Sequence, residues 1–349
     1  MLSSCSSNDL AKNVANSNTN SAKPNPPPPA LADVHAVGVF YWLSGFMYGG
    51  YWKNATQFGY GYNPNQNVES IFNKVYLNGA DVYIAGQTFN GQVNVATIYK
   101  NGVITNQYNS TLGNTFYSTN ANDMVIASTN TIVVGSDQSR AIIWNNAIPT
   151  ILKNTTSRAV GIARYNNMNY VIGDDLVSGS NLTASVTPTT KSYLWINGQE
   201  TLLSTFGMLY TTNIKIYNDI LYIAGGTLVN GVFTPIYITK NLATNSNFVV
   251  TTIPVTINTF VNSLLLVNSD LYLCGSANSK AVYWKNGTMT ILNSTINGFC
   301  ADIANFGTDI YIGGGLSNGN AKAAIWKNGV YRNYNGTLPG SSITSIAIQ

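Results

Sequence analysis

The stretch DIYIGG at residues 309–314, followed by WKNG at residues 326–329, indicates a repeat fold, because both signatures recur along the chain. DVYIAG at residues 81–86 and DLYLCG at residues 270–275 are close copies of the first signature. Further copies lie at residues 33–38, 131–135, 169–173 and 221–225. Successive copies are roughly 40 to 50 residues apart, and a period of this length is typical of repeat folds such as solenoids and propellers.

The second signature places an Asn after a run that usually ends in an aromatic residue. This Asn occupies positions 54, 101, 146, 197, 241, 286 and 328. Asn-Gly tolerates positive φ, which suits the type I′ turn of a β-hairpin. A partly alternating segment precedes most copies of the first signature, as at residues 68–77 and 299–306. Each period therefore predicts four short antiparallel strands, which we call a to d in chain order.

Four short strands in each period predict the blade of a β-propeller, because a single twisted sheet cannot bury both faces alone and stacks on its neighbours. The first repeat begins with its strand b at Asp33, and residues 342–349 resemble a strand a that no strand b follows. The two segments would complete one blade. We therefore expect an all-β seven-bladed β-propeller of four-stranded antiparallel blades over residues 32–349, closed by the C-terminal strand joining the N-terminal blade.

This layout resembles kelch-type propellers, in which a C-terminal strand closes a blade begun at the N-terminus. The Gly pair that follows strand b in that family is present at residues 225–226 and 313–314. The chain departs from the family in lacking its Trp in strand d and carrying aromatic residues in strand c. The repeats are also similar to those of secreted bacterial lipoproteins of unknown role, and either resemblance implies the fold without a function.

Residues 1–31 are rich in Ser, Asn and Pro, and this composition predicts a tether that is flexible at first and extended through the Pro run. LSSC at residues 2–5 resembles the lipobox of bacterial lipoproteins, in which the Cys is lipidated. That pattern also includes a charged region and an apolar region upstream, and only Met1 precedes the motif here. Cys5 is thus either a lipid anchor or an incidental Cys. We expect an envelope or extracellular protein that meets a membrane only through a lipid on Cys5.

Composition argues against several functional classes. Only 9% of the residues are charged, and the net charge is +4. The sequence contains no run of basic residues, so we expect no nucleic-acid partner. One His and three Cys are few for a metal site, and we predict neither a metal nor a cofactor. His35 takes the place of Tyr83 and Tyr272 in other repeats, which predicts packing. No catalytic residue is assigned, and we expect a protein that is not an enzyme.

The loops after strand b are the candidate binding region. In a propeller the b-c and d-a loops share one face, and the b-c loops vary from about four residues in the third blade to the 17 of residues 174–190 in the fourth. Asp137, Asp174 and Asp175 follow strand b in these blades, and Lys191 follows the long loop. The carboxylate oxygen atoms of the three aspartates suit a ligand or Ca²⁺. The alternative is that these residues belong to ordinary solvated loops. We predict that this face binds a protein or a glycan.

Two other functions remain open. The protein is either a structural component of an envelope or extracellular assembly, whose uncharged surfaces pack side by side, or a propeller hydrolase or lyase with carboxylates around the axis. The second needs acids that converge on one pocket, and the candidates are Asp137, Asp174, Asp175, Glu69 and Asp302. Cys274 and Cys300 lie in neighbouring blades, where they either form a disulfide or fill space in the core.

Overall fold

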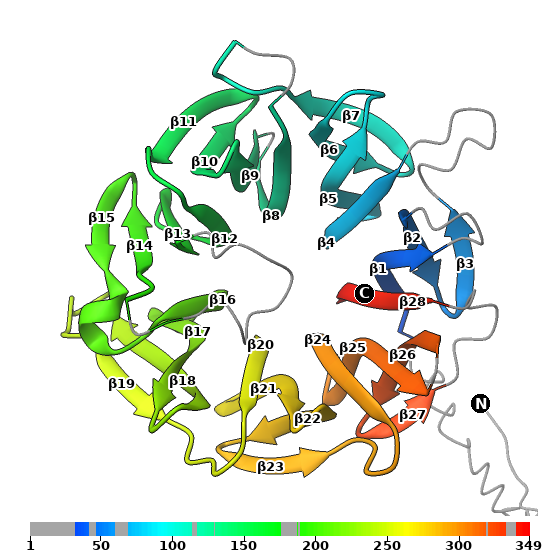
Figure 1. Ribbon diagram of the computed structural model, residues 1–349, viewed down its shortest axis with the longest axis vertical. Helices are drawn as coiled ribbons and strands as arrows, with labels where there is room; N and C mark the ends of the chain where they lie inside the picture. Colours follow the sequence, from blue (N-terminus) through cyan, green and yellow to red (C-terminus); the bar gives the residue numbers. More distant parts are fainter. Residues whose placement is uncertain are drawn as a thin grey trace, which may run out of the picture. The chain divides into compact units, whose positions relative to one another are not determined.

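A computed structural model describes residues 32–41, 47–59, 69–113, 117–128, 130–175, 187, 189–318, 320–332 and 340–349. Within these residues, seven four-stranded antiparallel sheets stand around a common axis (Figure 1). The expected all-β seven-bladed propeller is therefore confirmed. Cys5 and most of the loop at residues 174–190 lie outside the described residues.

The blades are numbered in chain order, and their strands run from the axis outward. Blades 1 to 3 contain β28 (Ser341–Ile348), β1 (Val34–Tyr41), β2 (Met47–Lys53) and β3 (Thr56–Gly59); β4 (Ser70–Asn78), β5 (Asp81–Phe89), β6 (Asn94–Lys100) and β7 (Val103–Tyr108); and β8 (Thr119–Ala127), β9 (Asn130–Asp137), β10 (Arg140–Asn145) and β11 (Ile148–Lys153). Blades 4 and 5 contain β12 (Arg158–Tyr165), β13 (Met168–Asp174), β14 (Ser192–Ile196) and β15 (Gln199–Leu202); and β16 (Tyr210–Tyr217), β17 (Ile220–Val229), β18 (Val232–Asn241) and β19 (Val249–Thr252). Blades 6 and 7 contain β20 (Thr259–Val267), β21 (Asp270–Ala277), β22 (Lys280–Lys285) and β23 (Thr288–Ile291); and β24 (Asn297–Phe306), β25 (Asp309–Asn318), β26 (Asn320–Lys327) and β27 (Val330–Arg332).

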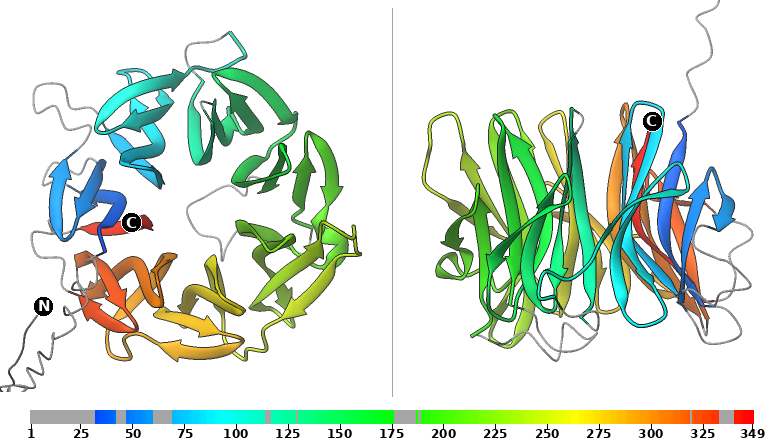
Figure 2. Two further views of the ribbon diagram at one scale, coloured as in Figure 1. Left: turned by 180° about the vertical axis from the view of Figure 1, so that it is seen from behind. Right: turned by 90° about the horizontal axis from the view of Figure 1, so that it is seen from above.

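The first and last described segments meet in blade 1, as the repeat pattern predicts. β28 pairs antiparallel with β1, which places Ile348 opposite Val34. Beyond the strands, the Asp33 N–H donates to the Gln349 carbonyl over 2.8 Å and the Gln349 N–H donates back over 3.1 Å. Figure 2 shows β28 in red beside β1 in blue.

The hydrophobic core lies between neighbouring blades. Every seam in the described part of the ring has its own cluster of buried residues, and the cluster between blades 7 and 1 includes Ile325, Ile343 and Ile346. The aromatic residues that end strand c in most repeats fill these seams. The tryptophans that are almost fully buried are Trp52, Trp144, Trp195, Trp284 and Trp326.

The repeated Asn has a defined structural task at the c-d turn. Asn286 has a φ of 49°, its side-chain oxygen accepts the Leu271 N–H over 2.9 Å, and its amide nitrogen donates to Asp270 over 2.7 Å. Lys285 completes the group with an ion pair to the same carboxylate at 2.8 Å. Blades 1, 2 and 7 repeat this group of Asp, Lys and Asn with Asp33, Lys53 and Asn54; Asp81, Lys100 and Asn101; and Asp309, Lys327 and Asn328.

Helical structure is minor within the described residues. A single turn of 3-10 helix, η1 (Leu203–Phe206), precedes blade 5. None of the helices in the described parts of the chain is long and apolar enough to cross a membrane.

A β-bulge interrupts each innermost strand at the same position and sets what faces the axis. In every blade of the described ring one residue is skipped in the pairing of the innermost strand with its neighbour. The skipped residues are Asn73, Asn122, Val160, Thr212, Asn262, Ala301 and Thr344. A bulge re-aims the side chains around it. The bulge residue and the one after it therefore both reach the axis, where many of them line one cavity.

Candidate binding site

Asp137 sits at the end of β9, on the predicted loop face. Its carboxylate is fully buried and accepts hydrogen bonds from the Thr111 N–H over 2.9 Å and the Thr111 hydroxyl over 2.6 Å. Arg140 forms an ion pair with it at 2.9 Å. Burial alone would raise the pKa of Asp137, but hydrogen bonds from Ser110 and Thr111 and the charge of Arg140 lower it. Asp137 thus joins blade 3 to the segment that follows blade 2.

Asp174 is the last residue of β13 and joins blade 4 to blade 5. It is 1% exposed, pairs with Arg158 at 2.8 Å and accepts the Thr211 N–H over 3.3 Å. Burial raises the pKa of Asp174 despite the charge of Arg158.

Asp175 and Lys191 form the described base of the long loop. The Asp175 carboxylate accepts the Lys191 N–H over 3.1 Å and the Tyr193 hydroxyl over 2.7 Å, while the Lys191 side chain is exposed. Asp137 and Asp174 share no hydrogen-bonding partner among the described residues. In the described part of the chain no group of three or more His, Cys, Asp and Glu is arranged to hold a metal ion.

A polar pocket of about 340 Å³ opens beside these acids on the loop face. It spans blades 2, 3 and 4, and its lining side chains are mostly amides and hydroxyls, with one guanidinium. They belong to Gln87, Ser118, Thr119, Asn120, Asn122, Ser136, Gln138, Ser139 and Arg158. Asp174 does not line the pocket itself. It positions the lining residue Arg158 through their ion pair.

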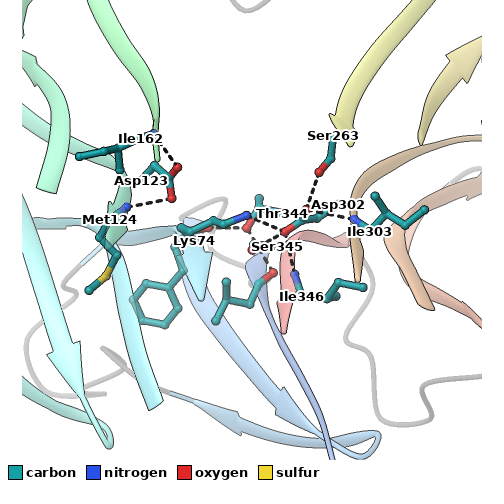
Figure 3. Close-up of polar contacts among 12 residues, drawn as sticks. Lys74, Asp123, Met124, Ile162, Ser263, Asp302, Ile303, Thr344, Ser345 and Ile346 are labelled. Carbon is teal, nitrogen blue, oxygen red and sulfur yellow. Dashed lines mark hydrogen bonds and ion pairs between the residues drawn. The ribbon is translucent and has the colours of Figure 1, made fainter. Parts of the chain in front are cut away.

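A second polar site lies on the axis, and it was not predicted from the sequence. Lys74 of β4 and Asp302 of β24 follow the bulges of blades 2 and 7, and their charged groups meet at 2.9 Å (Figure 3). Asp302 also accepts hydrogen bonds from the hydroxyls of Ser263 and Ser345 over 2.7 and 2.6 Å, and from two backbone N–H groups. Burial alone would raise the pKa of Asp302, but Lys74 and Lys215, with the Ser345 hydrogen bond, lower it to about 2.

Asp123 of β8 occupies the equivalent position in blade 3. Its two oxygen atoms accept the N–H groups of Met124 over 2.8 Å and Ile162 over 3.0 Å. It makes no ion pair with any residue that the structure describes, and burial raises its pKa even though Lys74 and Lys215 act against this. A cavity of about 100 Å³ separates these groups.

Neighbouring blades are also tied together at the axis by the bulge side chains. Asn73, Asn122 and Asn262 donate to backbone carbonyls of the next blade, namely Ala121, Ala159 and Cys300. The Thr344 hydroxyl donates to the Phe72 carbonyl over 2.6 Å. The acceptor in each case is the residue just before the next bulge, so the bulges build a chain of contacts around part of the ring.

The five acids that are candidates for a hydrolase or lyase site do not gather in one place. Asp302 is at the axis as that reading requires, whereas Asp137, Asp174 and Asp175 bond at the loop face. Glu69 precedes β4, where its backbone carbonyl accepts the Phe89 N–H.

The two predicted core cysteines and the single histidine take packing positions. Cys274 and Cys300 are both free thiols, buried in the cluster between blades 6 and 7. Their buried positions correspond to the space-filling alternative. His35 is 1% exposed, with its Nδ1 2.7 Å from the Tyr51 hydroxyl oxygen.

No protein-family model and no curated protein sequence matches the chain. Among solved structures, a hypothetical selenium-binding protein from Sulfolobus tokodaii is similar with a TM-score of 0.55 and 6% identity, over 92% of this chain and 94% of that protein. A puromycin-hydrolyzing peptidase from Mycobacterium tuberculosis has a TM-score of 0.50 and 8% identity over 73% of this chain, which spans only 45% of the peptidase. These likenesses show a shared fold alone.

Proposed function

We propose that the propeller is a binding module whose loop-face pocket takes an uncharged polar ligand, a glycan. The observation that carries this proposal is the lining of the 340 Å³ pocket by side-chain amides and hydroxyls. These groups donate and accept hydrogen bonds, and sugar hydroxyls do the same. The volume falls in the range of small-molecule sites, whereas a protein partner needs a wider surface of about 800 Å² on each side.

The direct test is a glycan array followed by calorimetric titration of the best binder with the full chain. Gln87→Ala and Gln138→Ala each remove an amide from the pocket and should weaken binding about three- to tenfold, the effect of one neutral hydrogen bond. Gln199→Ala alters an exposed amide on outer strand β15 and should leave the affinity unchanged. Equal affinity in the pocket variants, or capture of a protein with no glycan bound, would contradict the assignment.

We also propose that the protein is exported and held at a membrane by lipid on Cys5. The support is the LSSC motif at residues 2–5 and the tether-like composition up to residue 31. Several acyl chains on one Cys give stable anchoring, whereas a single chain does not. Expressed in bacteria behind a complete signal peptide, the protein should fractionate with membranes and Cys5→Ala should be soluble. An unmodified Cys5 in the membrane fraction, seen by mass spectrometry, would refute the anchor.

Assembly into a larger structure is the second candidate, and the outer strands favour it. β7, β19 and β23 contain no charged residue, and Val103, Val249 and Met289 on them are exposed. Uncharged apolar edge strands pair readily with other chains. Sedimentation should then show concentration-dependent association that Val249→Lys weakens. A monomer at every concentration would exclude it.

A further inference from the structure

A second large pocket, of about 320 Å³, lies where blade 5 meets blade 6, and we call it the seam pocket. The segment between β19 and β20 crosses from the outermost strand of blade 5 to the innermost strand of blade 6 (Figure 1). Its residues 253–257 form one side of the pocket, and Trp284 of β22 and Met289 of β23 lie on the other. Most of the lining side chains are apolar, and every one of them is uncharged. Pockets of this size and lining are typical of small-molecule sites.

Trp284 gives the seam pocket a hydrogen-bond donor that the fold does not use. The residue is only 1% exposed, and its indole N–H makes no hydrogen bond with any residue that the structure describes. In blade 4 the equivalent N–H of Trp195 donates to Glu200 over 3.2 Å. A buried polar group without a partner is costly, so a ligand that accepts this N–H removes the cost.

Blade 3 shows what fits beside such a tryptophan. Tyr108 of β7 stacks on Trp144 of β10, with ring centroids 5.1 Å apart and an interplanar angle of 19°. Trp144 and Trp284 are equivalent, because each lies two residues beyond the strand-c residue that pairs with the repeated Gly. Ile253 takes the place of Tyr108, because each lies across from the strand-c residue that pairs with the position after the repeated Gly.

The seam pocket therefore lies beside a tryptophan that has lost its stacking partner. No aromatic ring of a described residue packs against Trp284, and both Ile253 and Trp284 line the pocket. A cavity of about 150 Å³ holds benzene, so one of about 320 Å³ has room for about twelve non-hydrogen atoms, which is one ring and a short substituent. Stacked aromatic pairs gain more than the area that they bury, which favours an aromatic ring over an aliphatic group here.

We propose that the seam pocket binds a small neutral aromatic compound with an oxygen acceptor on a short flexible arm, such as 2-phenylethanol. The ring covers the face of Trp284 as Tyr108 covers Trp144, and the arm lets the oxygen accept the N–H at the edge of the indole. A charged ligand is disfavoured, because no lining residue offsets the cost of taking its charge out of water. The seam pocket shares no residue with the loop-face pocket, so this proposal is independent of glycan binding.

The test is calorimetric titration of the full chain with 2-phenylethanol and two analogues that each lack one of its features. We expect saturable binding of 2-phenylethanol. Ethylbenzene lacks the oxygen and should bind about three- to tenfold more weakly, because the Trp284 N–H stays unpaired. 2-Cyclohexylethanol lacks the flat ring and should bind about two- to tenfold more weakly, because it cannot stack. Equal affinity of either analogue would overturn the assignment, and so would the absence of saturable binding of 2-phenylethanol.

Ile253→Tyr supplies to blade 6 the ring that Tyr108 supplies to blade 3. The variant should fill the pocket, melt near the parent temperature and bind 2-phenylethanol at least about tenfold more weakly. Ile148→Tyr, at a position on β11 that is 70% exposed, is the matched control and should bind like the parent.

Met289→Glu tests the same pocket without changing a buried residue. Met289 is 41% exposed and lines the pocket, so the variant places a charge against the bound ring. It should weaken 2-phenylethanol binding at least about tenfold. Unchanged affinity in Ile253→Tyr, or in Met289→Glu if the first variant does not fold, would refute the site.

Discussion

Asp302 is the residue on which most of the axis depends. It accepts hydrogen bonds from blades 1, 2, 6 and 7, and its side chain is only 6% exposed. A buried ion pair adds little net stability compared with apolar residues, but the loss of one partner leaves the other charge buried and alone. Lys74 is 17% exposed and has no other acid within ion-pair distance among the described residues.

Asp302→Asn should therefore lower the free energy of unfolding by about 3–5 kcal/mol, measured by urea denaturation. Adding Lys74→Met should recover part of this loss, since no charge is then left unpaired. The exposed pair of Lys53 and Asp33 provides the control, and its double variant should change stability by less than about 1 kcal/mol. If Asp302→Asn changed the free energy of unfolding no more than that control does, the axial pair would not contribute to stability.

The lowered pKa of Asp302 also predicts how the stability of the protein changes at acidic pH. The pKa is about 2 in the folded protein against an ordinary 3.8. The folded state thus favours the ionised form, and this contribution is present above pH 3.8 and lost as the pH falls toward 2. The difference corresponds to about 2 kcal/mol. Unfolding measured from pH 5 to pH 2 should show a steeper loss in the parent than in Asp302→Asn, and parallel curves would contradict it.

Among the elements, the c-d turn shows why the same Asn recurs at this position. At a φ near 50° a side chain with Cβ is strained, and Asn is among the residues that tolerate this region best. Its amide then joins the start of strand b to the turn. The aspartates at these turns are therefore structural.

Asn286→Ala should lower the free energy of unfolding by about 2 kcal/mol, because it adds strain at positive φ and removes two hydrogen bonds. Asn286→Gly keeps the backbone relaxed and should cost about half as much. Thermal melts of the two variants give the comparison. A glycine variant less stable than the alanine variant would mean that backbone strain is not the governing cost.

The blades could be predicted from the sequence because each strand repeats its own pattern. The axial site was missed because Lys74, Asp123 and Lys215 are far apart in the chain and form no local motif. A signal existed, because four of the axial residues share one place in the repeat. Lys74, Asp123, Asn213 and Asp302 each lie nine residues before the position that is three residues ahead of the repeated Gly, namely positions 83, 132, 222 and 311. The β-bulge just before this position directs these side chains to the axis. The sequence placed Asp174 on the loop face but could not reveal its pairing with Arg158, 16 residues earlier.

At the scale of the whole ring, closure by β28 is the feature on which stability rests. Ile343 and Ile346 of this strand are 0% and 4% exposed, and Ser345 bonds to Asp302 in blade 7. The strand also covers the inner edge of β1, which would otherwise expose its backbone groups.

Deletion of residues 342–349 should lower the free energy of unfolding by about 5 kcal/mol or more, since two buried isoleucines and one strand pairing are lost. Differential scanning calorimetry measures the effect. Gln349→Ala keeps the two backbone hydrogen bonds to Asp33 and serves as the control. A truncated protein that melts like the parent would show that the ring does not depend on this strand.

The same closure shapes what happens on the ribosome. Blade 1 has three of its strands by residue 59, but the fourth is only complete once residue 348 has been made. At about 5–20 residues per second, the nascent chain carries an uncovered β1 for about 15–60 s. During that time any extended segment can pair with it, including one from a neighbouring polysome chain. A chaperone that shields the first blade until synthesis finishes would therefore raise the yield of folded protein without changing its final stability.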